Sequence, residues 1–270
     1  MEVSLAPPAE RAGYRLAAFE EIGSTSTEAL TRAAAGEAGP LWIVAGRQSA
    51  GRGRRGSSWQ SPSGNLAASL LLTTELPAML VAQLGFVAGV AVLRALDRCC
   101  PSARARPALG AGFQLKWPND VLAGGAKLAG ILLQTEEVHG RRAVVVGIGL
   151  NVASAPAGLP YATASLRDLG YHVDAASLFT ALSETWLAAH ADWAEGRGFD
   201  RVRAEWLGRA TGVGGAVAVR TGAAVTRGVF ETIDEHGQLV LRAHDGSPRR
   251  VNAGEVHFGT TATERAGAQP

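Results

Sequence analysis

The chain has 270 residues, 47% of them hydrophobic, which is enough apolar surface for a sizeable core and excludes disorder over the whole length. A chain of this length favours two domains. Lys and Arg (26) nearly balance Asp and Glu (24), so the net charge is +2, too small for a protein whose main partner is a polyanion. Any anion that the chain binds is therefore small or held by a local basic patch.

The cysteines and the N-terminus indicate the compartment. Cys99 and Cys100 are adjacent, which gives neither a disulfide framework nor a metal-ligand spacing. The N-terminus carries charges and two prolines rather than the apolar run of a signal peptide. The longest apolar stretch, 84–93, is shorter than the roughly 20 residues that cross a bilayer. We therefore expect a cytoplasmic protein that contacts no membrane.

The first part of the chain predicts a mixture of strands and helices. Residues 1–15 have the composition of a flexible arm, and an ordered segment starts at Leu16. Ser24 or Ser26 can cap the first helix, because a serine hydroxyl accepts a hydrogen bond from the free amides of the first turn. The elements predicted after the arm are a helix over 27–35, strands over 41–45 and 66–73, and a long buried helix over 77–98.

The second part predicts a strand meander, two helices and a small barrel. Gly124-Gly125 and His139-Gly140 are turn signals within the meander, which covers 113–146. Apolar residues recur at helical spacing over 175–195, and a shorter helix covers 199–207. Short alternating strands after Gly212 are typical of a small barrel. The expected divisions are a flexible arm over 1–15, one domain over 16–210, a second over 211–258, and a disordered tail over 259–270.

The segment Gly51-Arg52-Gly53-Arg54-Arg55-Gly56, called the arginine loop below, matches the dinucleotide spacing GxGxxG. That match is misleading, because Pro62 and Gly64 follow where a Rossmann unit needs a helix. A Walker A loop is also excluded, since Ser57 stands where the lysine belongs. What remains is a flexible backbone with three guanidinium groups that can bind phosphates and carboxylates. A solvated basic loop, or a contact to nucleic acid, is about equally compatible with this segment alone.

Two lysines flank a predicted hairpin. Lys116 begins the sequence KWPND at the end of an edge-like strand, where Pro118 removes a backbone donor and fixes the turn. Lys127 begins KLAGIL, and the Gly124-Gly125 turn brings both lysines to the same end of the sheet, where they can face a phosphate. Taken singly, a Lys-Trp pair at a strand end is more often a matter of packing and solvation, and it is the convergence of the two lysines that favours a site. The sequence GIGLN over 147–151 ends a further strand with glycines that admit a ligand closely and an amide that donates and accepts, although a plain turn is equally compatible.

These motifs, in this order, resemble those of biotin protein ligases. The resemblance spans about 18–258, and its motifs are Gly23-Ser24-Thr25, Gln48 with the arginine loop, Trp59, KWPND, KLAGIL, GIGLN and Ala253-Gly254-Glu255-Val256. It implies an α+β fold, with a catalytic domain like that of class II aminoacyl-tRNA synthetases, a mixed sheet with flanking helices, and a small SH3-like barrel at the C-terminus. Two features depart from the family pattern. Ser26 replaces the usual asparagine, and fewer than twenty residues precede the pattern, which leaves no room for the helix-turn-helix of repressor-type members and predicts no specific DNA binding.

The resemblance implies an ATP-dependent ligase that activates biotin as biotinyl-5′-AMP and transfers it to a lysine of a biotin carboxyl carrier protein or domain. ATP and Mg²⁺ are implied, the Mg²⁺ held through the ATP phosphates without named protein ligands. Positive charge must screen the attack of a carboxylate on a phosphate, and the implied catalytic residues are Lys116, Arg54 and Lys127. The implied biotin-binding residues are Ser24, Thr25, Ser26, Gln48, Arg52, Gly53, Arg54 and Lys116. The implied nucleotide-binding residues are Arg54, Arg55, Trp59, Lys116, Asn119, Lys127 and Asn151.

Two other functions stay open. A lipoate protein ligase shares the catalytic fold, although the arginine loop together with KWPND favours biotin. A nucleic-acid-binding module would use the basic patch between Arg47 and Arg55, but the small net charge and the lack of a stacking-aromatic motif argue against it. The sequence carries no signature of a Ser/His/Asp triad or of a metalloprotease, and the implied reaction needs no nucleophilic side chain.

Overall fold

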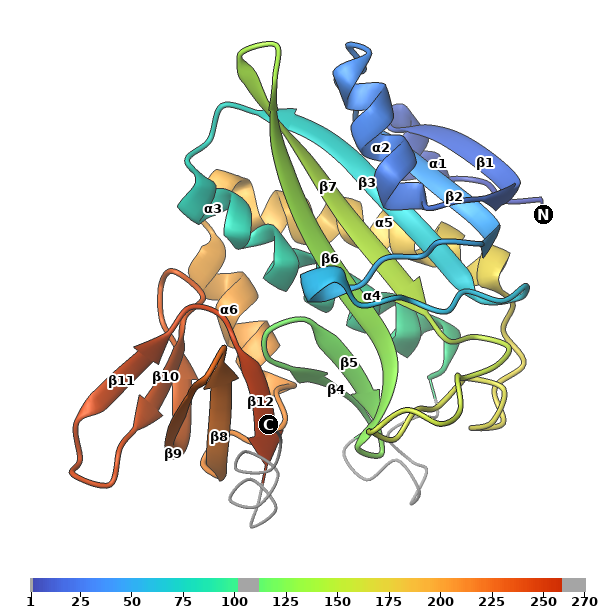
Figure 1. Ribbon diagram of the computed structural model, residues 1–270. Helices are drawn as coiled ribbons and strands as arrows, with labels where there is room; N and C mark the ends of the chain where they lie inside the picture. The colour runs from blue at the N-terminus through green and yellow to red at the C-terminus, as the bar shows by residue number, and fades with distance from the viewer. Residues whose placement is uncertain (1, 102–111, 259–270) are drawn as a thin grey trace.

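The structure is a computed structural model that describes residues 2–101 and 112–258, and it contains two β-sheets (Figure 1). The larger, seven-stranded sheet has the order β1-β2-β3-β7-β6-β5-β4. It is mixed, because β1 runs parallel to β2 while the other neighbours are antiparallel. Its strands are β1 (Arg15–Ile22), β2 (Leu41–Gln48), β3 (Leu66–Thr74), β4 (Phe113–Lys116), β5 (Asp120–Ala123), β6 (Ala126–Val138) and β7 (Arg141–Leu150).

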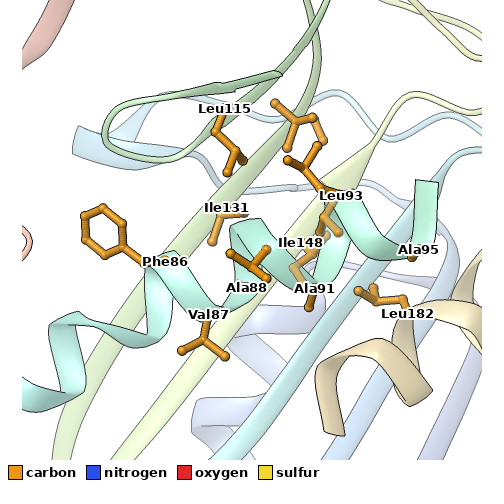
Figure 2. Close-up of a cluster of buried hydrophobic side chains, with 14 of the residues drawn as sticks. Phe86, Val87, Ala88, Ala91, Leu93, Ala95, Leu115, Ile131, Ile148 and Leu182 are labelled. Atoms are coloured by element: carbon orange, nitrogen blue, oxygen red, sulfur yellow. The ribbon is translucent and has the colours of Figure 1, made fainter. Parts of the chain in front are cut away.

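Helices cover both faces of this sheet. The period of two along each strand divides its apolar residues between the two faces of the sheet. Trp42 and Val44 pack with α4 (Leu84–Cys99) and α5 (Ala175–Trp193), while Ile43 packs with α2 (Thr25–Ala34). Figure 2 shows part of the larger cluster, in which Ala91 of α4 lies beside Ile148 of β7. The helices are α1 (Pro7–Arg11), α2 (Thr25–Ala34), α3 (Ala78–Ala82), α4 (Leu84–Cys99), α5 (Ala175–Trp193) and α6 (Phe199–Gly208).

The segment Ala78–Cys99, which contains α3 and α4, is a long and strongly apolar helical stretch. By length and composition it could cross a membrane, with a mean hydropathy of 2.0 over its best window. Inside the structure 72% of that window is buried, because α4 packs against the sheet, α5 and α6. The hydropathy of α4 is therefore that of a central core helix.

The smaller, five-stranded sheet is entirely antiparallel, with the order β11-β10-β9-β8-β12. Its turns fall at Glu235-His236-Gly237 and His244-Asp245-Gly246, as the sequence predicts. The predicted fold class, a mixed sheet with flanking helices and a small C-terminal β-domain, is confirmed. The strands are β8 (Ala216–Thr221), β9 (Ala224–Ile233), β10 (Leu239–Arg242), β11 (Pro248–Val251) and β12 (Glu255–Phe258).

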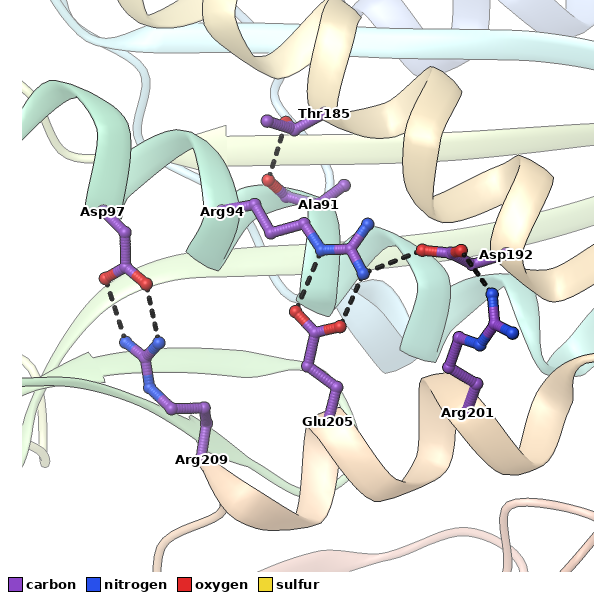
Figure 3. A network of polar contacts seen from close by, with 8 residues as sticks. All are labelled: Ala91, Arg94, Asp97, Thr185, Asp192, Arg201, Glu205 and Arg209. Carbon is purple, nitrogen blue, oxygen red and sulfur yellow. Dashed lines mark hydrogen bonds and ion pairs between the residues drawn. The ribbon is translucent and has the colours of Figure 1, made fainter.

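The connection between the two sheets is bonded to edge strand β4. Leu115 donates its amide to the Arg209 carbonyl (2.8 Å) and accepts the Thr211 amide (2.8 Å). The Arg209 guanidinium pairs with Asp97 of α4 and also donates to the Phe113 carbonyl. Figure 3 shows this pair beside a second network, in which Arg94 is held by Glu205 and Asp192, and Asp192 also accepts from Arg201. The strand that ends at Lys116 is thus fixed on both sides.

The expectation of a flexible arm over 1–15 differs from the structure. Residues Pro7–Arg11 form α1, because a proline at the first helical position has no amide to leave unsatisfied and already has a helical φ. Leu5, Ala6 and Ala9 are buried, and the Ala6 amide donates to Ser183 Oγ of α5 at 2.9 Å. The apolar residues of the arm therefore belong to the main core. The tail expected over 259–270 lies outside the described residues.

Candidate active site

The first turn of α2 carries a buried cluster of polar side chains. Ser24 is the N-cap, and its Oγ accepts the Thr27 amide at 3.4 Å, so of the two predicted caps it is Ser24 that the helix uses. Gln48, at the end of β2, accepts at Oε1 from both the amide (2.8 Å) and the Oγ1 (3.1 Å) of Thr25. Ser24, Thr25 and Ser26 are all buried. The sequence predicted these four residues as one site, and the structure brings them together.

Ser69 of β3 completes this cluster, and sequence reasoning missed it. Its Oγ lies 2.8 Å from Thr25 Oγ1 and 3.0 Å from Ser26 Oγ, and the side chain is fully buried. Gly147 of the neighbouring strand β7 pairs with Ser69, and a Cβ added to Gly147 would lie 2.8 Å from Ser26 Oγ. The available signal was a single hydroxyl among the apolar residues of a strand, a position that must find polar partners once buried.

The arginine loop starts beside this cluster. The amides of Ser49 and Ala50 donate to the carbonyls of Ile22 (3.0 Å) and Gly23 (2.8 Å), which ties the base of the loop to the start of α2. A Cβ on Gly51 would collide with the Trp59 carbonyl and lie 3.1 Å from Gln48 Nε2. A glycine is therefore required where the loop passes the Gln48 amide.

Within the loop the three arginines have different surroundings. Arg54 is half-buried and donates from Nη1 to Asn119 Oδ1 at 2.9 Å. Burial, helped by the charge of Arg55, lowers the pKa of Arg54, while Asp120 and Glu255 act in the opposite direction. Arg52 and Arg55 are exposed, so they do not join Arg54 in the interior. The Gly53 amide closes the loop by donating to the Ser57 carbonyl at 2.7 Å.

Trp59 lies over two glycines that face each other across β6 and β7. Gly130 and Gly149 are paired in register. A Cβ on Gly149 would overlap the Trp59 indole, and one on Gly130 would lie 3.2 Å from its Cζ3. The glycines of KLAGIL and GIGLN therefore make a shallow floor on which an aromatic ring can lie.

The two lysines come near each other, as the sequence predicts, and Arg54 lies near the same two carboxylates as Lys116. Lys127 Nζ is 2.8 Å from Asp120 Oδ1 and 5.7 Å from the centroid of the Trp59 ring. Lys116 Nζ lies 5.5 Å from the Phe258 ring centroid of β12. Burial lowers the pKa of Lys116, and the charge of Lys127 adds to this effect, whereas Asp120 and Glu255 raise it. Positive charge is thus gathered here and partly balanced by two carboxylates.

Asn151 is buried at the end of β7, beneath this region. Its Nδ2 donates to the Ala164 carbonyl at 3.2 Å, and its backbone amide donates to the Leu128 carbonyl at 2.9 Å. Its Oδ1 is buried and has no hydrogen-bond donor among the described residues. A buried acceptor without a donor is costly, so this oxygen is suited to a donor supplied by a ligand.

Comparison with known proteins agrees with these motifs. Residues 19–151 match the Biotin/lipoate A/B protein ligase family, and residues 213–259 match the Biotin protein ligase C terminal domain. A biotin--[acetyl-CoA-carboxylase] ligase of Paracoccus denitrificans is 41% identical over 244 residues, which cover 87% of this chain and 97% of the relative. The chain belongs to the biotin protein ligase family. The predicted resemblance is therefore confirmed.

Two further relatives extend the match. A biotin--[acetyl-CoA-carboxylase] ligase of Mycobacterium tuberculosis is 33% identical over 253 residues, covering 90% of this chain and 89% of the relative. The structure of the Aquifex aeolicus biotin protein ligase in complex with biotin and ATP superimposes with a TM-score of 0.73, at 24% identity, over 91% of this chain and 98% of that one. The fold of this chain is therefore the fold of the family, including the C-terminal sheet.

Proposed function

We propose that the chain is an ATP-dependent biotin protein ligase. The observation that carries this proposal is the buried cluster of Thr25, Ser26, Ser69 and Gln48, which lies at the base of a loop that carries Arg54 toward the lysines. The ureido ring of biotin has two N–H donors and a carbonyl acceptor, which hydroxyl and amide groups can satisfy. The dithiolane ring of lipoate has neither, so burying these polar groups against it would be costly.

The cationic side chains of the site account for the reaction. The carboxylate of biotin attacks the α-phosphorus of ATP, a P–O bond forms, and pyrophosphate leaves. Arg54, Lys116 and Lys127 stabilise the charge that develops around this phosphorus, because they are fixed before the reaction begins. In the second step the amine of an acceptor lysine attacks the carbonyl of the mixed anhydride, an amide forms, and AMP leaves.

The remaining predicted residues have proposed places in this reaction. Arg52 and Gly53 close over biotin as the arginine loop folds inward, with Ser24 and Gln48 at its polar end. Burial of Arg54 and its bond to Asn119 support a nucleotide on the neighbouring side of the loop. The proposed nucleotide contacts are Arg54, Arg55, Trp59, Lys116, Asn119, Lys127 and Asn151.

We also propose that Mg²⁺ enters with ATP. In the described part of the chain no three His, Cys, Asp or Glu side chains gather into a metal-binding group. Mg²⁺ keeps several of its waters and binds readily through substrate phosphates, so it needs no dedicated protein cage. Bound in this way, it would neutralise phosphate charge while Lys116, Lys127 and Arg54 do the same from the protein side.

The proposed protein partner is the biotin carboxyl carrier protein or domain of a biotin-dependent carboxylase, in the cytoplasm. We propose that 16–210 form the catalytic unit and 211–258 the C-terminal unit. The two matched family segments fall on either side of this boundary. Contacts such as that of Trp117 Nε1 with the Gly237 carbonyl, at 3.1 Å, couple the two units.

Biotin-dependent exchange of labelled pyrophosphate into ATP tests the first step. We expect exchange with biotin and none with lipoate. Thr25→Val, which keeps the shape and removes the hydroxyl, should weaken biotin binding by about tenfold, since a buried hydrogen-bond partner is lost. Exchange with lipoate and not with biotin would contradict the proposed substrate.

A further inference from the structure

Asn65 holds the chain segment that leaves β7. Its side chain is 1% exposed, and it stands immediately before β3. Oδ1 of this one amide accepts three successive backbone amides, from Val152 (3.0 Å), Ala153 (2.9 Å) and Ser154 (3.1 Å). Nδ2 donates back to the Ser154 carbonyl at 2.8 Å. The amide thus satisfies four backbone groups that would otherwise be left without these partners.

The position of Asn65 links two parts of the site. Its own amide donates to the Pro62 carbonyl at 3.3 Å, so it ends the segment that returns from the arginine loop. Its neighbour Leu66 pairs with Leu150 across β3 and β7, and Asn151 is the next residue after Leu150. The amides that Asn65 gathers begin directly after Asn151. The direction in which the chain leaves Asn151 is therefore fixed by the Asn65 side chain.

The unsatisfied oxygen of Asn151 makes this constraint functional. Asn151 is oriented by its own bonds to Leu128 and Ala164, and the carbonyl of Asn151 accepts the Leu166 amide at 3.0 Å. Those bonds form only if the backbone at 151–154 keeps its conformation. We propose that Asn65 is a positioning residue for the nucleotide, which acts by holding the segment 152–154 so that Asn151 Oδ1 faces a donor of the bound adenylate. The inference rests on the proposed function.

The buried polar cluster of α2 has separate supports, so the effect of Asn65 is specific. Thr25 and Ser26 are held by Gln48 and Ser69, and neither of these bonds passes through Asn65. Loss of Asn65 should therefore weaken the binding of ATP and leave the binding of biotin alone unchanged. A merely structural role would weaken both, or neither.

The test compares three variants of the full chain by pyrophosphate exchange and by calorimetric titration with biotin in the absence of nucleotide. Asn65→Ala should raise the KM for ATP about tenfold, as expected for the loss of one hydrogen bond to a ligand. Its Kd for biotin should stay within about twofold of that of the parent. Asn65→Asp, which keeps an acceptor for the three amides, should restore most of the ATP affinity. Ser183→Ala is the matched control, because Ser183 is also buried and accepts a backbone amide, but lies on α5 beside the N-terminal arm.

A double variant separates action through Asn151 from a general loss of order. If Asn65 acts through Asn151, Asn65→Ala should add no further increase to the ATP KM of Asn151→Ala.

The inference is overturned if Asn65→Ala keeps the parental KM for ATP, if biotin and ATP affinities fall together, or if Ser183→Ala raises the ATP KM equally. If Asn65→Ala does not fold, Asn65→Asp is compared with Asn65→Ser instead. Equal KM values for ATP in these two variants would overturn the inference. Absence of exchange in the parent protein would instead overturn the proposed function, and this inference with it.

Discussion

Lys116 combines burial with charges of both signs in its surroundings. Burial lowers its pKa, Lys127 acts in the same direction, and Asp120 and Glu255 favour its charged form. The side chain also lies over the ring of Phe258, from the C-terminal sheet. An ammonium held in this way is already oriented before a phosphate arrives. Its contribution should therefore be greatest in the transition state of adenylate formation.

Lys116→Ala is expected to lower the rate of biotin-dependent pyrophosphate exchange by a factor on the order of 10² to 10³, as for the loss of one preorganised electrostatic contact. Lys116→Arg should recover little, because a planar fork cannot replace a compact charge in a confined place. The matched control is Arg141→Ala, since Arg141 is an exposed cation at the start of β7. If Lys116 is only a solvated strand end, both lysine variants keep normal exchange and stabilities within about 0.5 kcal/mol of the parent.

Glu37 supplies a pH dependence at the other end of the sheet. Hydrogen bonds from Arg15 and from the Gly39 amide lower its pKa from 4.5 to about 2. A carboxylate with a lowered pKa in the folded state stabilises the fold above the unfolded value, and this contribution is lost as the pH falls. Between pH 4.5 and about 2, the unfolding free energy of Glu37→Gln should therefore decrease less steeply with falling pH than that of the parent protein.

Urea unfolding at several pH values measures this effect. Arg15→Met removes the main partner and should reduce the acid-induced loss of stability in part, because the Gly39 amide still bonds Glu37. The double variant should behave like Glu37→Gln. The size of the change should be modest, because the Arg15 side chain is 54% exposed and solvent screens the pair. An unchanged acid limb in both single variants would contradict the account of Glu37.

At the same scale, the sequence predicted some site residues and not others. Ser24, Thr25 and Gln48 could be named because they stand in recognisable motifs. The two lysines were expected to lie close together because the Gly124-Gly125 turn comes between them in the chain; in the structure their strands, β4 and β6, lie on either side of β5. Ser69 and Asn65 could not be found in this way. Ser69 stands alone among apolar residues, whereas Asn65 ends the loop sequence Ser-Pro-Ser-Gly-Asn and looks like an ordinary loop residue. The partners of both are distant in the chain, at Ser26 and at 152–154. Those partners come together only because β3 pairs with β7 and packs against α2.

At the scale of helices and strands, hydrophobic periodicity predicted most of the elements. The helices over 175–195 and 199–207 correspond to α5 and α6, and the strand over 66–73 to β3. The long helix expected over 77–98 is divided at Gln83 into α3 and α4, and the Gln83 side chain bonds Trp193 and the Glu235 carbonyl. The division follows from contacts with other elements, which local periodicity does not contain.

The N-terminal segment differs from the flexible arm that its composition predicts. Leu5 is nevertheless 6% exposed and belongs to the main core. Leu5→Ala should lower the unfolding free energy by about 2 to 3 kcal/mol, the usual cost of removing a buried leucine. Met79→Ala is the control, because Met79 is 52% exposed and should cost little. Equilibrium unfolding in urea distinguishes them, and a change within about 0.5 kcal/mol for Leu5→Ala would show that the arm is flexible.

At the scale of the whole molecule, the proposed ligand sites consist of residues from both sheets and from the loops between their strands. The arginine loop, KWPND and β12 meet around Lys116, so a bound adenylate would contact several of them at once. Biotin and ATP together should therefore raise the melting temperature far more than either alone, because a ligand that binds only the folded state stabilises it by mass action. Thermal unfolding with each ligand and with both measures this. A shift with lipoate and ATP, but none with biotin and ATP, would contradict the assignment of substrate.

The central claim, that this chain joins biotin to a carrier through an adenylate, is tested most directly by transfer of labelled biotin to a purified carrier domain of a biotin-dependent carboxylase. We expect one acceptor lysine to be labelled when ATP is present, no labelling when ATP is omitted, and strongly reduced labelling by Lys116→Ala. Replacement of the acceptor lysine by arginine in the carrier should abolish labelling. Labelling that does not depend on ATP, or its absence with folded protein, biotin and ATP all present, would contradict the account.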